Sequence, residues 1–163
     1  MRFKYKILST IILSVFFVIS TPLFAELFDE YGECNSFNEG VKILGIERFY
    51  QVEDRMNISV HSIIDNGIYT QGDLWIIINS PNARLYMTDE PFNQFSATPK
   101  PFVKSVQFLD NEFVVLSNFI VPPGFGGDYS IYAFFTKEEA NLDELFETLL
   151  SNMDSENFTL SNN

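Results

Sequence analysis

His61 is the single histidine of the chain and the ordinary candidate for a general base near neutral pH. A hydrolase needs such a base beside a nucleophile, although the two can be far apart in the sequence. No G-x-S-x-G pattern marks a nucleophilic serine, and Cys34 lies in an acidic segment without a regular pattern. A small hydrolase that uses His61 is therefore an alternative and not the leading interpretation.

Oxygen-rich side chains raise the question of a metal. Zinc normally requires several His or Cys ligands, and this chain has one residue of each type. Calcium requires only oxygen ligands, which Asp54, Asp89 and Asp128 would supply if their loops met at one end of a β-sandwich. The spacing of these residues is not that of an EF-hand. We therefore expect no cofactor and keep a calcium-stabilised module as an alternative.

Four tyrosines are the candidate binding residues. They lie in or beside expected strands, where an aromatic surface can receive a sugar or a protein partner. Trp75 is expected in the core, because it lies on an expected central strand. A carbohydrate-binding module is therefore a further alternative. The four tyrosines are Tyr69, Tyr86, Tyr129 and Tyr132.

The residues around His61 and Trp75 have the patterns of strands. Met56, Ile58 and Val60 alternate with polar residues, which predicts a strand with one buried face and His61 on the other face. Residues 74–78 are continuously apolar, which predicts a central strand covered on both faces. Residues 84–88 are expected to return beside that strand as a hairpin.

The second half of the domain contains further strands and one helix. An irregular connection over 89–101 is expected to fold Phe92 and Phe95 back onto the body. Residues 102–109 and 112–121 are expected to pair through a tight turn at Asp110-Asn111.

A strand rich in aromatic residues is expected over 129–136. The apolar stripe that begins at Leu142 predicts a helix to about Met153, capped by Asn141. Residues 157–160 would then form a terminal strand or fray. This pattern of short strands favours a mainly β domain, an antiparallel sandwich more than a barrel, with one C-terminal helix.

The amino terminus has the features of an export signal. A basic leader precedes an apolar run over residues 7–19, which is shorter than the roughly 20 residues that span a bilayer. We predict that residues 1–25 are a secretory signal peptide, cleaved after Ala25, and that no stable membrane span remains. An uncleaved anchor is the alternative. An acidic lead-in over 26–48, a β-sandwich over 49–140 and a C-terminal helix and tail over 141–163 are expected to follow.

The charge balance limits the classes of partner. The chain has 10 Lys and Arg against 22 Asp and Glu, with a formal net charge of −12. Nucleic acids attract basic surfaces, so this composition argues against a nucleic-acid partner. Cys34 is the only cysteine, so the fold has no internal disulfide, and an intermolecular disulfide or a free thiol is left open.

Two pairs of segments carry a family resemblance. Residues 72–78 and 81–86 resemble a "DLYVAV…P.G.LYF" hairpin, and residues 121–124 and 127–133 resemble a "VP.G…G.Y.FYA" hairpin. Both hairpins are typical of bacterial immunoglobulin-like modules of larger secreted or surface proteins. The resemblance covers about residues 49–140, and it implies an immunoglobulin-like β-sandwich outside the cytoplasm. Its motifs are structural, so it implies no catalytic residues.

Together these observations predict an exported, non-catalytic module of the bacterial envelope, in the periplasm or outside the cell. The expected partner is a protein or a cell-surface component. The edge strands of an open sandwich could accept an extended segment of such a partner.

Overall fold

The structure is a computed structural model that describes residues 40–64, 68–91, 93–109 and 111–162. The predicted signal peptide, most of the acidic lead-in with Cys34, and Phe92 lie outside the described residues. So does Asp110 of the expected tight turn.

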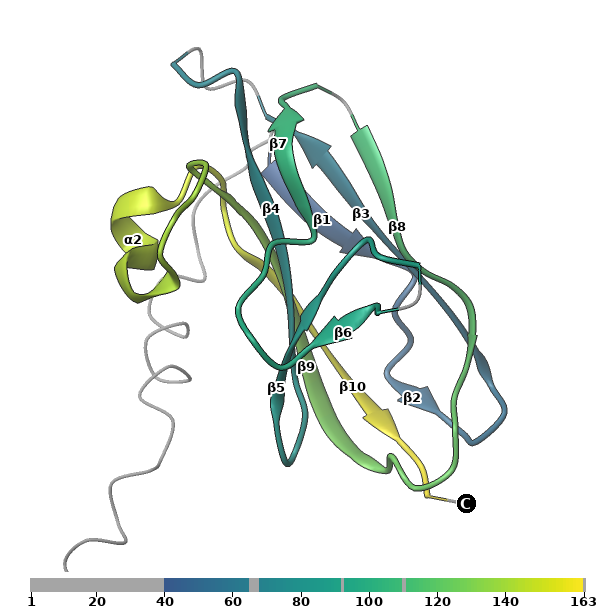
Figure 1. Cartoon of the computed structure of the whole chain (residues 1–163). Coiled ribbons are helices and arrows are strands. Elements are labelled where there is room, and N and C mark those ends of the chain that lie inside the picture. Colours follow the sequence, from purple (N-terminus) through teal and green to yellow (C-terminus); the bar gives the residue numbers. More distant parts are fainter. Residues whose placement is uncertain (1–39, 65–67, 92, 110, 163) are drawn as a thin grey trace, which may run out of the picture. The chain divides into compact units, whose positions relative to one another are not determined.

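Within these ranges, ten strands form two sheets that pack face to face (Figure 1). The strand pairs are antiparallel, except for the short parallel pair of β2 and β10. The small sheet has the order β1-β3-β8: β1 (Gly40–Leu44), β3 (Arg55–Ile63) and β8 (Asn111–Ile120). The large sheet has the order β2-β10-β9-β4-β5-β6: β2 (Phe49–Tyr50), β10 (Asp154–Leu160), β9 (Gly127–Thr136), β4 (Gln71–Asn79), β5 (Arg84–Met87) and β6 (Phe95–Ser96). A further strand, β7 (Val103–Gln107), also pairs with β4.

The two expected strand patterns are confirmed. In β3, Met56, Ile58 and Val60 are buried against the large sheet, and His61 on the opposite face is half-buried. β4 is the central strand of the large sheet and is covered on both faces, as its continuous apolar sequence predicted. The expected hairpin with residues 84–88 is formed by β5.

The outer face of the large sheet carries a second apolar cluster. Trp75 and Phe134 are paired across β4 and β9, and Leu145 packs on the same cluster. The indole Nε1 of Trp75 donates a hydrogen bond of 2.9 Å to Thr136 Oγ1, so this buried polar group is satisfied. The expectation that Trp75 is buried is confirmed, since the residue is only 4% exposed.

The C-terminal helix is shorter than the predicted one over 142–153. It consists of the 3-10 turn η1 (Leu142–Glu144) followed by α2 (Leu145–Thr148). The expected cap is present, because the side chain of Asn141 accepts a hydrogen bond from the Asp143 amide. The helix ends because Leu149 leaves helical geometry and bridges to Thr136, after which the chain enters β10. In the described part of the chain, no helix is long and apolar enough to cross a membrane.

The expected hairpin of residues 102–109 and 112–121 is wrong. β7 pairs with β4 in the large sheet, whereas β8 pairs with β3 in the small sheet. The Asp73 carboxylate stabilises this arrangement, because it accepts a hydrogen bond of 2.9 Å from the Ser105 amide in β7. β7 and β8 therefore lie in different sheets and do not form a hairpin.

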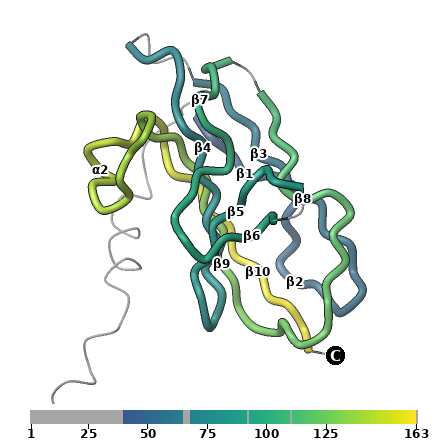
Figure 2. Tube along the Cα trace, in the orientation of Figure 1, coloured from purple at the N-terminus to yellow at the C-terminus, as the bar shows by residue number. Residues whose placement is uncertain are grey.

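The sheets also extend beyond the range of 49–140 that was expected for the sandwich. β1 comes from the expected lead-in, and β10 comes from the expected tail. β10 lies between β2 and β9, so residues 157–160 form a strand and do not fray (Figure 2). Two side chains, one just before β10 and one at its first residue, also bind the outer edge of β1: Asn152 accepts from Val41 N and Asp154 accepts from Ile43 N, each at 2.7 Å.

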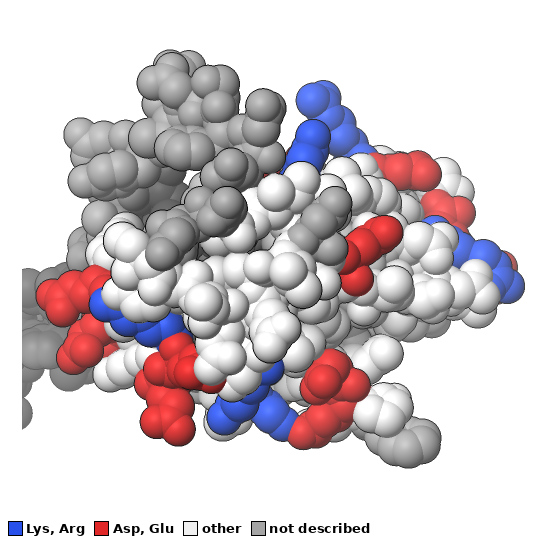
Figure 3. All heavy atoms as spheres, turned by 90° about the horizontal axis from the view of Figure 1, so that it is seen from above, with Lys and Arg blue, Asp and Glu red and all other residues white. Residues whose placement is uncertain are grey.

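Charged side chains surround an uncharged area on the end of the molecule seen from above (Figure 3). Acidic and basic residues are interspersed there, and the basic residues do not gather into one patch. This face therefore lacks the continuous basic footprint that attracts a nucleic acid.

Candidate functional site: a groove beside strands β9 and β10

A groove of about 570 Å³ lies beside strands β9 and β10. This volume falls within the range of roughly 300–1,000 Å³ that is usual for small-molecule sites. Its wall combines charged, polar and aromatic side chains. The lining residues are Arg48, Asp128, Tyr129, Ser130, Glu156, Asn157, Phe158 and Thr159.

The groove follows the edge of β10. Alternate residues of a strand point to opposite faces, and the consecutive residues 156–159 all line the groove. β2 pairs with β10 only at Thr159 and Leu160. The edge of β10 at Glu156 and Asn157 therefore lies beyond the end of β2, and the groove occupies this position.

Two cross-strand hydrogen bonds order the polar wall. Asp128 is paired with Thr159 across the strands, and Thr159 Oγ1 donates to Asp128 Oδ1 at 2.7 Å. In the next row, Ser130 Oγ donates to Asn157 Oδ1 at 2.6 Å. These bonds orient the Asn157 amide so that its Nδ2 group remains a donor, while Asp128 keeps its second oxygen as an acceptor.

Tyr129 and Phe158 pair across β9 and β10 on the opposite face, which packs on the core, and their rings are stacked with centroids 5.3 Å apart. Phe158 is buried, and Tyr129 is half-buried. Burial raises the pKa of the Tyr129 phenol above its ordinary value of 10.0. The phenol therefore stays protonated at neutral pH and donates a hydrogen bond of 2.6 Å to the Phe125 carbonyl.

Two exposed phenylalanines come from segments that border the groove. Phe49 directly follows Arg48, is paired with Thr159, and has 51% of its surface exposed. Phe125 is bonded to Tyr129 through its carbonyl and is 57% exposed. Single exposed apolar side chains are common on protein surfaces, so the interest of these two lies in their position next to the groove residues.

The charged groups of the groove have different roles. The carboxylate of Asp128 is bonded to Thr159, whereas Arg48 and Glu156 make no ion pair with another residue in the described ranges. Both side chains are exposed. The groove therefore presents a cationic donor and anionic acceptors close together.

The four predicted tyrosines are distributed over three places. Tyr129 lines the groove, whereas Tyr86 and Tyr132 flank Ile77 in one row on the outer face of the large sheet. Tyr86 is buried and packs edge-on against Trp75, with ring centroids 6.3 Å apart. Tyr69 lies at the end of the sheet, where the Lys137 Nζ is 5.9 Å from its ring centroid. They do not form one flat aromatic surface.

His61, the residue of the hydrolase alternative, lies on the outer face of the small sheet. The strand register places it between Lys42 of β1 and Glu112 of β8. These neighbours are side chains of an open sheet face, and His61 is not among the residues that line the groove.

The calcium candidates occupy separate parts of the fold. Asp54 follows β2 and accepts a hydrogen bond from the Gln51 amide, Asp89 follows β5, and Asp128 lines the groove. Among the described residues, no group of three His, Cys, Asp or Glu side chains is placed to hold a metal ion.

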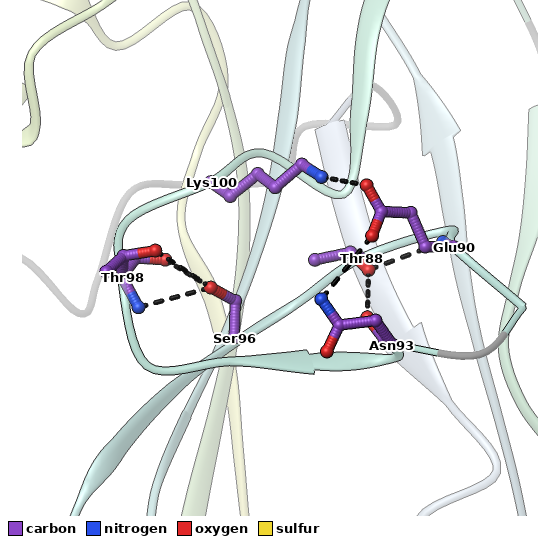
Figure 4. A network of polar contacts seen from close by, with 6 residues as sticks. All are labelled: Thr88, Glu90, Asn93, Ser96, Thr98 and Lys100. Carbon is purple, nitrogen blue, oxygen red and sulfur yellow. Dashed lines mark hydrogen bonds and ion pairs between the residues drawn. The ribbon is translucent and has the colours of Figure 1, made fainter.

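The segment from Thr88 to Lys100, which includes β6, contains a separate polar network (Figure 4). Glu90 forms an ion pair with Lys100 and accepts a further hydrogen bond from Asn93 Nδ2. The Lys100 ammonium lowers the pKa of the Glu90 carboxyl below its ordinary value of 4.5. Thr88 bridges the start of the segment by donating to the Asn93 carbonyl. The bonds are internal to the segment, so they indicate a structural role.

Sequence reasoning found Asp128 and Tyr129 of the groove but not its other lining residues. Arg48 and Asn157 lie far apart in the sequence and become neighbours only through the pairing of β2 with β10. The feature of the sequence that pointed to this site was residues 157–160, which were expected either to form a terminal strand or to fray.

Comparison with protein-family models, with curated proteins and with solved structures found no match to the chain.

Proposed function

We propose that this protein is an exported, non-catalytic binding module with an immunoglobulin-like arrangement of strands. The observation that carries the binding role is the groove beside β9 and β10, with its ordered polar wall and with two exposed phenylalanines in the segments that border it. The target is a protein or a cell-surface component.

The strand order supports the immunoglobulin-like class. β1, β3 and β8 have the positions of strands A, B and E, and β10, β9, β4, β5 and β6 have those of G, F, C, C′ and C″. Two features differ from that class. β7 pairs with β4 instead of with β8, and a chain with a single cysteine has no disulfide between its sheets. A fold class does not define a function, so the argument for binding rests on the groove.

Export is the second part of the proposal. It rests on the basic leader and apolar run within residues 1–25, and it places the module in the periplasm or outside the cell. Expression of the full chain should yield an exported protein with Glu26 at its amino terminus. Retention of residues 1–25 on the purified protein would contradict the cleavage.

A capture experiment with matched variants tests the binding role. The bait is the chain from Glu26 with Cys34→Ser, and it is incubated with envelope and culture-medium fractions of the organism that encodes it. Phe125→Ser should reduce the amount of captured partner at least tenfold. Phe146→Ser is the control, because Phe146 lies on α2 and is also 57% exposed. Equal capture by both variants, or no capture by a folded bait, would overturn the proposal.

A further inference from the structure

We propose that the outer face of the small sheet binds a second copy of this chain, so that the protein forms a symmetric dimer. This inference does not depend on the groove, which lies beside strands of the large sheet. It rests on the exposed apolar side chains of the outer face and on the order of the charges across its three strands.

The outer face carries apolar side chains that belong to neither core cluster. Alternate residues of β3 are buried toward the large sheet, so Ile63 points to the opposite face, where Leu44 and Val114 are paired with Ser59. All three apolar side chains are exposed, Val114 by 63%. Among the described residues, neither apolar cluster includes them. Contact with apolar side chains of a partner would therefore remove apolar surface from water, which is favourable.

Two neighbouring rows of side chains cross this face from β1 through β3 to β8. The rows are Leu44, Ser59 and Val114, and then Lys42, His61 and Glu112. Lys42 and Glu112 are exposed on opposite edges of the sheet with β3 between them. In the described part of the chain, neither of these two residues takes part in an ion pair.

A twofold axis parallel to β3 makes this face complementary to itself. When two copies stack face to face about such an axis, β3 lies on β3, and β1 of each copy lies on β8 of the other. Each residue keeps its row, so Lys42 meets Glu112 of the second copy, and Leu44 meets Val114. Aligned sheets pack about 10 Å apart with their strands within about 30° of parallel, and extended lysine and glutamate side chains together bridge this distance. A twofold axis across the strands would place β1 on β1, so Lys42 would not meet Glu112.

The balance of charge on this face favours a second copy as the partner. The whole chain has a formal net charge of −12, so copies repel one another in most orientations. The regular part of the face, formed by β1 and residues 59–63 and 111–114, has one cation and one carboxylate. A partner surface of either sign would attract one of these groups and repel the other. A second copy related by the proposed axis attracts both, and this complementarity defines the orientation of the dimer.

The expected dimer is weak. Three strands about 4.8 Å apart form a face only about 15 Å wide, and irregularities next to Ile58 end its regular part. The buried area is therefore below the roughly 1,200–2,000 Å² of stable interfaces, and association depends on concentration. Strands β9 and β10 take no part in the contact, so each dimer carries two grooves. Two linked binding sites hold a target with repeated sites more tightly than one.

Sedimentation velocity at neutral pH tests the dimer. The purified protein carries Cys34→Ser, which excludes an intermolecular disulfide, and is measured from about 10 μM to about 1 mM. The sedimentation coefficient of the parent chain should rise with concentration toward that of a dimer. Lys42→Glu should weaken association at least about tenfold, because it places two carboxylates opposite each other at both ends of the row. Lys104→Glu makes the same change of charge at an exposed position on β7 and should associate as the parent chain does.

A mixing experiment then tests the orientation. Glu112→Lys places two ammonium groups opposite each other, so it should weaken association although it makes the chain less acidic. An equimolar mixture of Lys42→Glu and Glu112→Lys should associate more strongly than either variant alone, because each charge then meets its opposite. A parent chain that stays monomeric at every concentration would overturn the inference. So would equal association of Lys42→Glu and Lys104→Glu, or a mixture that associates no better than its components.

Discussion

At the scale of single residues, Asp73 is a buried carboxylate in the large sheet. It is only 2% exposed, and its two carboxylate oxygens accept hydrogen bonds from the amides of Ser105 and Glu139. Both of these residues have positive φ angles, 52° and 57°, which non-glycine residues adopt rarely. One buried carboxylate therefore holds two unusual backbone turns on separate segments.

Asp73→Asn is expected to destabilise the protein. The amide keeps one acceptor but presents an NH₂ group to the second backbone amide, so one buried hydrogen bond is replaced by two opposed donors. The free energy of unfolding should fall by about 1–3 kcal/mol, measured by chemical denaturation. Asp89→Asn, at an exposed position after β5, is the control and should stay close to the parent chain. If Asp73→Asn lowered the free energy of unfolding no more than Asp89→Asn does, the two turns would not depend on this carboxylate.

At the scale of elements, the ion pair of Glu90 and Lys100 joins the segment before β6 to the segment after it (Figure 4). Hydrogen bonding to Lys100 lowers the pKa of Glu90, so the folded state favours the ionised carboxylate. The contribution of this pair to folding is therefore present above the ordinary pKa of 4.5 and is lost as the pH falls through the lowered pKa. Exposure to solvent keeps this contribution small.

Lys100→Gln is expected to raise the pKa of Glu90 toward its ordinary value. The shift should be partial, because Asn93 Nδ2 still donates to the carboxylate. The measurement is a pH titration of the Glu90 carboxyl carbon by nuclear magnetic resonance. Lys104→Gln, an equal change of charge on β7, should leave the Glu90 titration where it is in the parent chain. The same titration midpoint in the parent and in Lys100→Gln would contradict the ion pair.

At the scale of the whole domain, the two sheets are joined by a shared core and by side-chain contacts along one side. Val41 and Ile43 of the small sheet are buried in the core that contacts the large sheet. Their amides are bound by the side chains of Asn152 and Asp154, which belong to the approach to β10 and to β10 itself. Asn152 Nδ2 also donates to the Val41 carbonyl, so this side chain pairs with β1 much as a neighbouring strand would.

Asn152→Ala is expected to loosen β1. Two hydrogen bonds to Val41 are lost at a partly exposed edge, so the free energy of unfolding should fall by about 1–2 kcal/mol. Hydrogen exchange of the Val41 amide should accelerate more than that of amides in β4, because the change acts on one edge. Ser155→Ala is the matched control on the neighbouring part of β10. Unchanged exchange at Val41 would show that β1 is held by core packing alone.

Local sequence patterns determined the faces of several strands. The alternation around His61 defined the buried face of β3, and the apolar run over 74–78 defined β4 as a central strand. The same reasoning predicted a buried Trp75 and a cap at Asn141, since each depends on residues that are close in the sequence. The acidic net charge also argued against a nucleic acid as a partner.

The tertiary structure alone decided which strands became neighbours. Residues 102–109 and 112–121 have the pattern of a hairpin, but β7 joins β4 and β8 joins β3, because long-range pairing and the Asp73 carboxylate outweigh a short turn. The predicted helix was cut short because the same segment must reach β10 beside β9. The groove brings together Arg48, residues 128–130 and residues 156–159. A local pattern defines which face of a strand is buried but not its partner strand, so a site built across strands appears only when the sheets have formed.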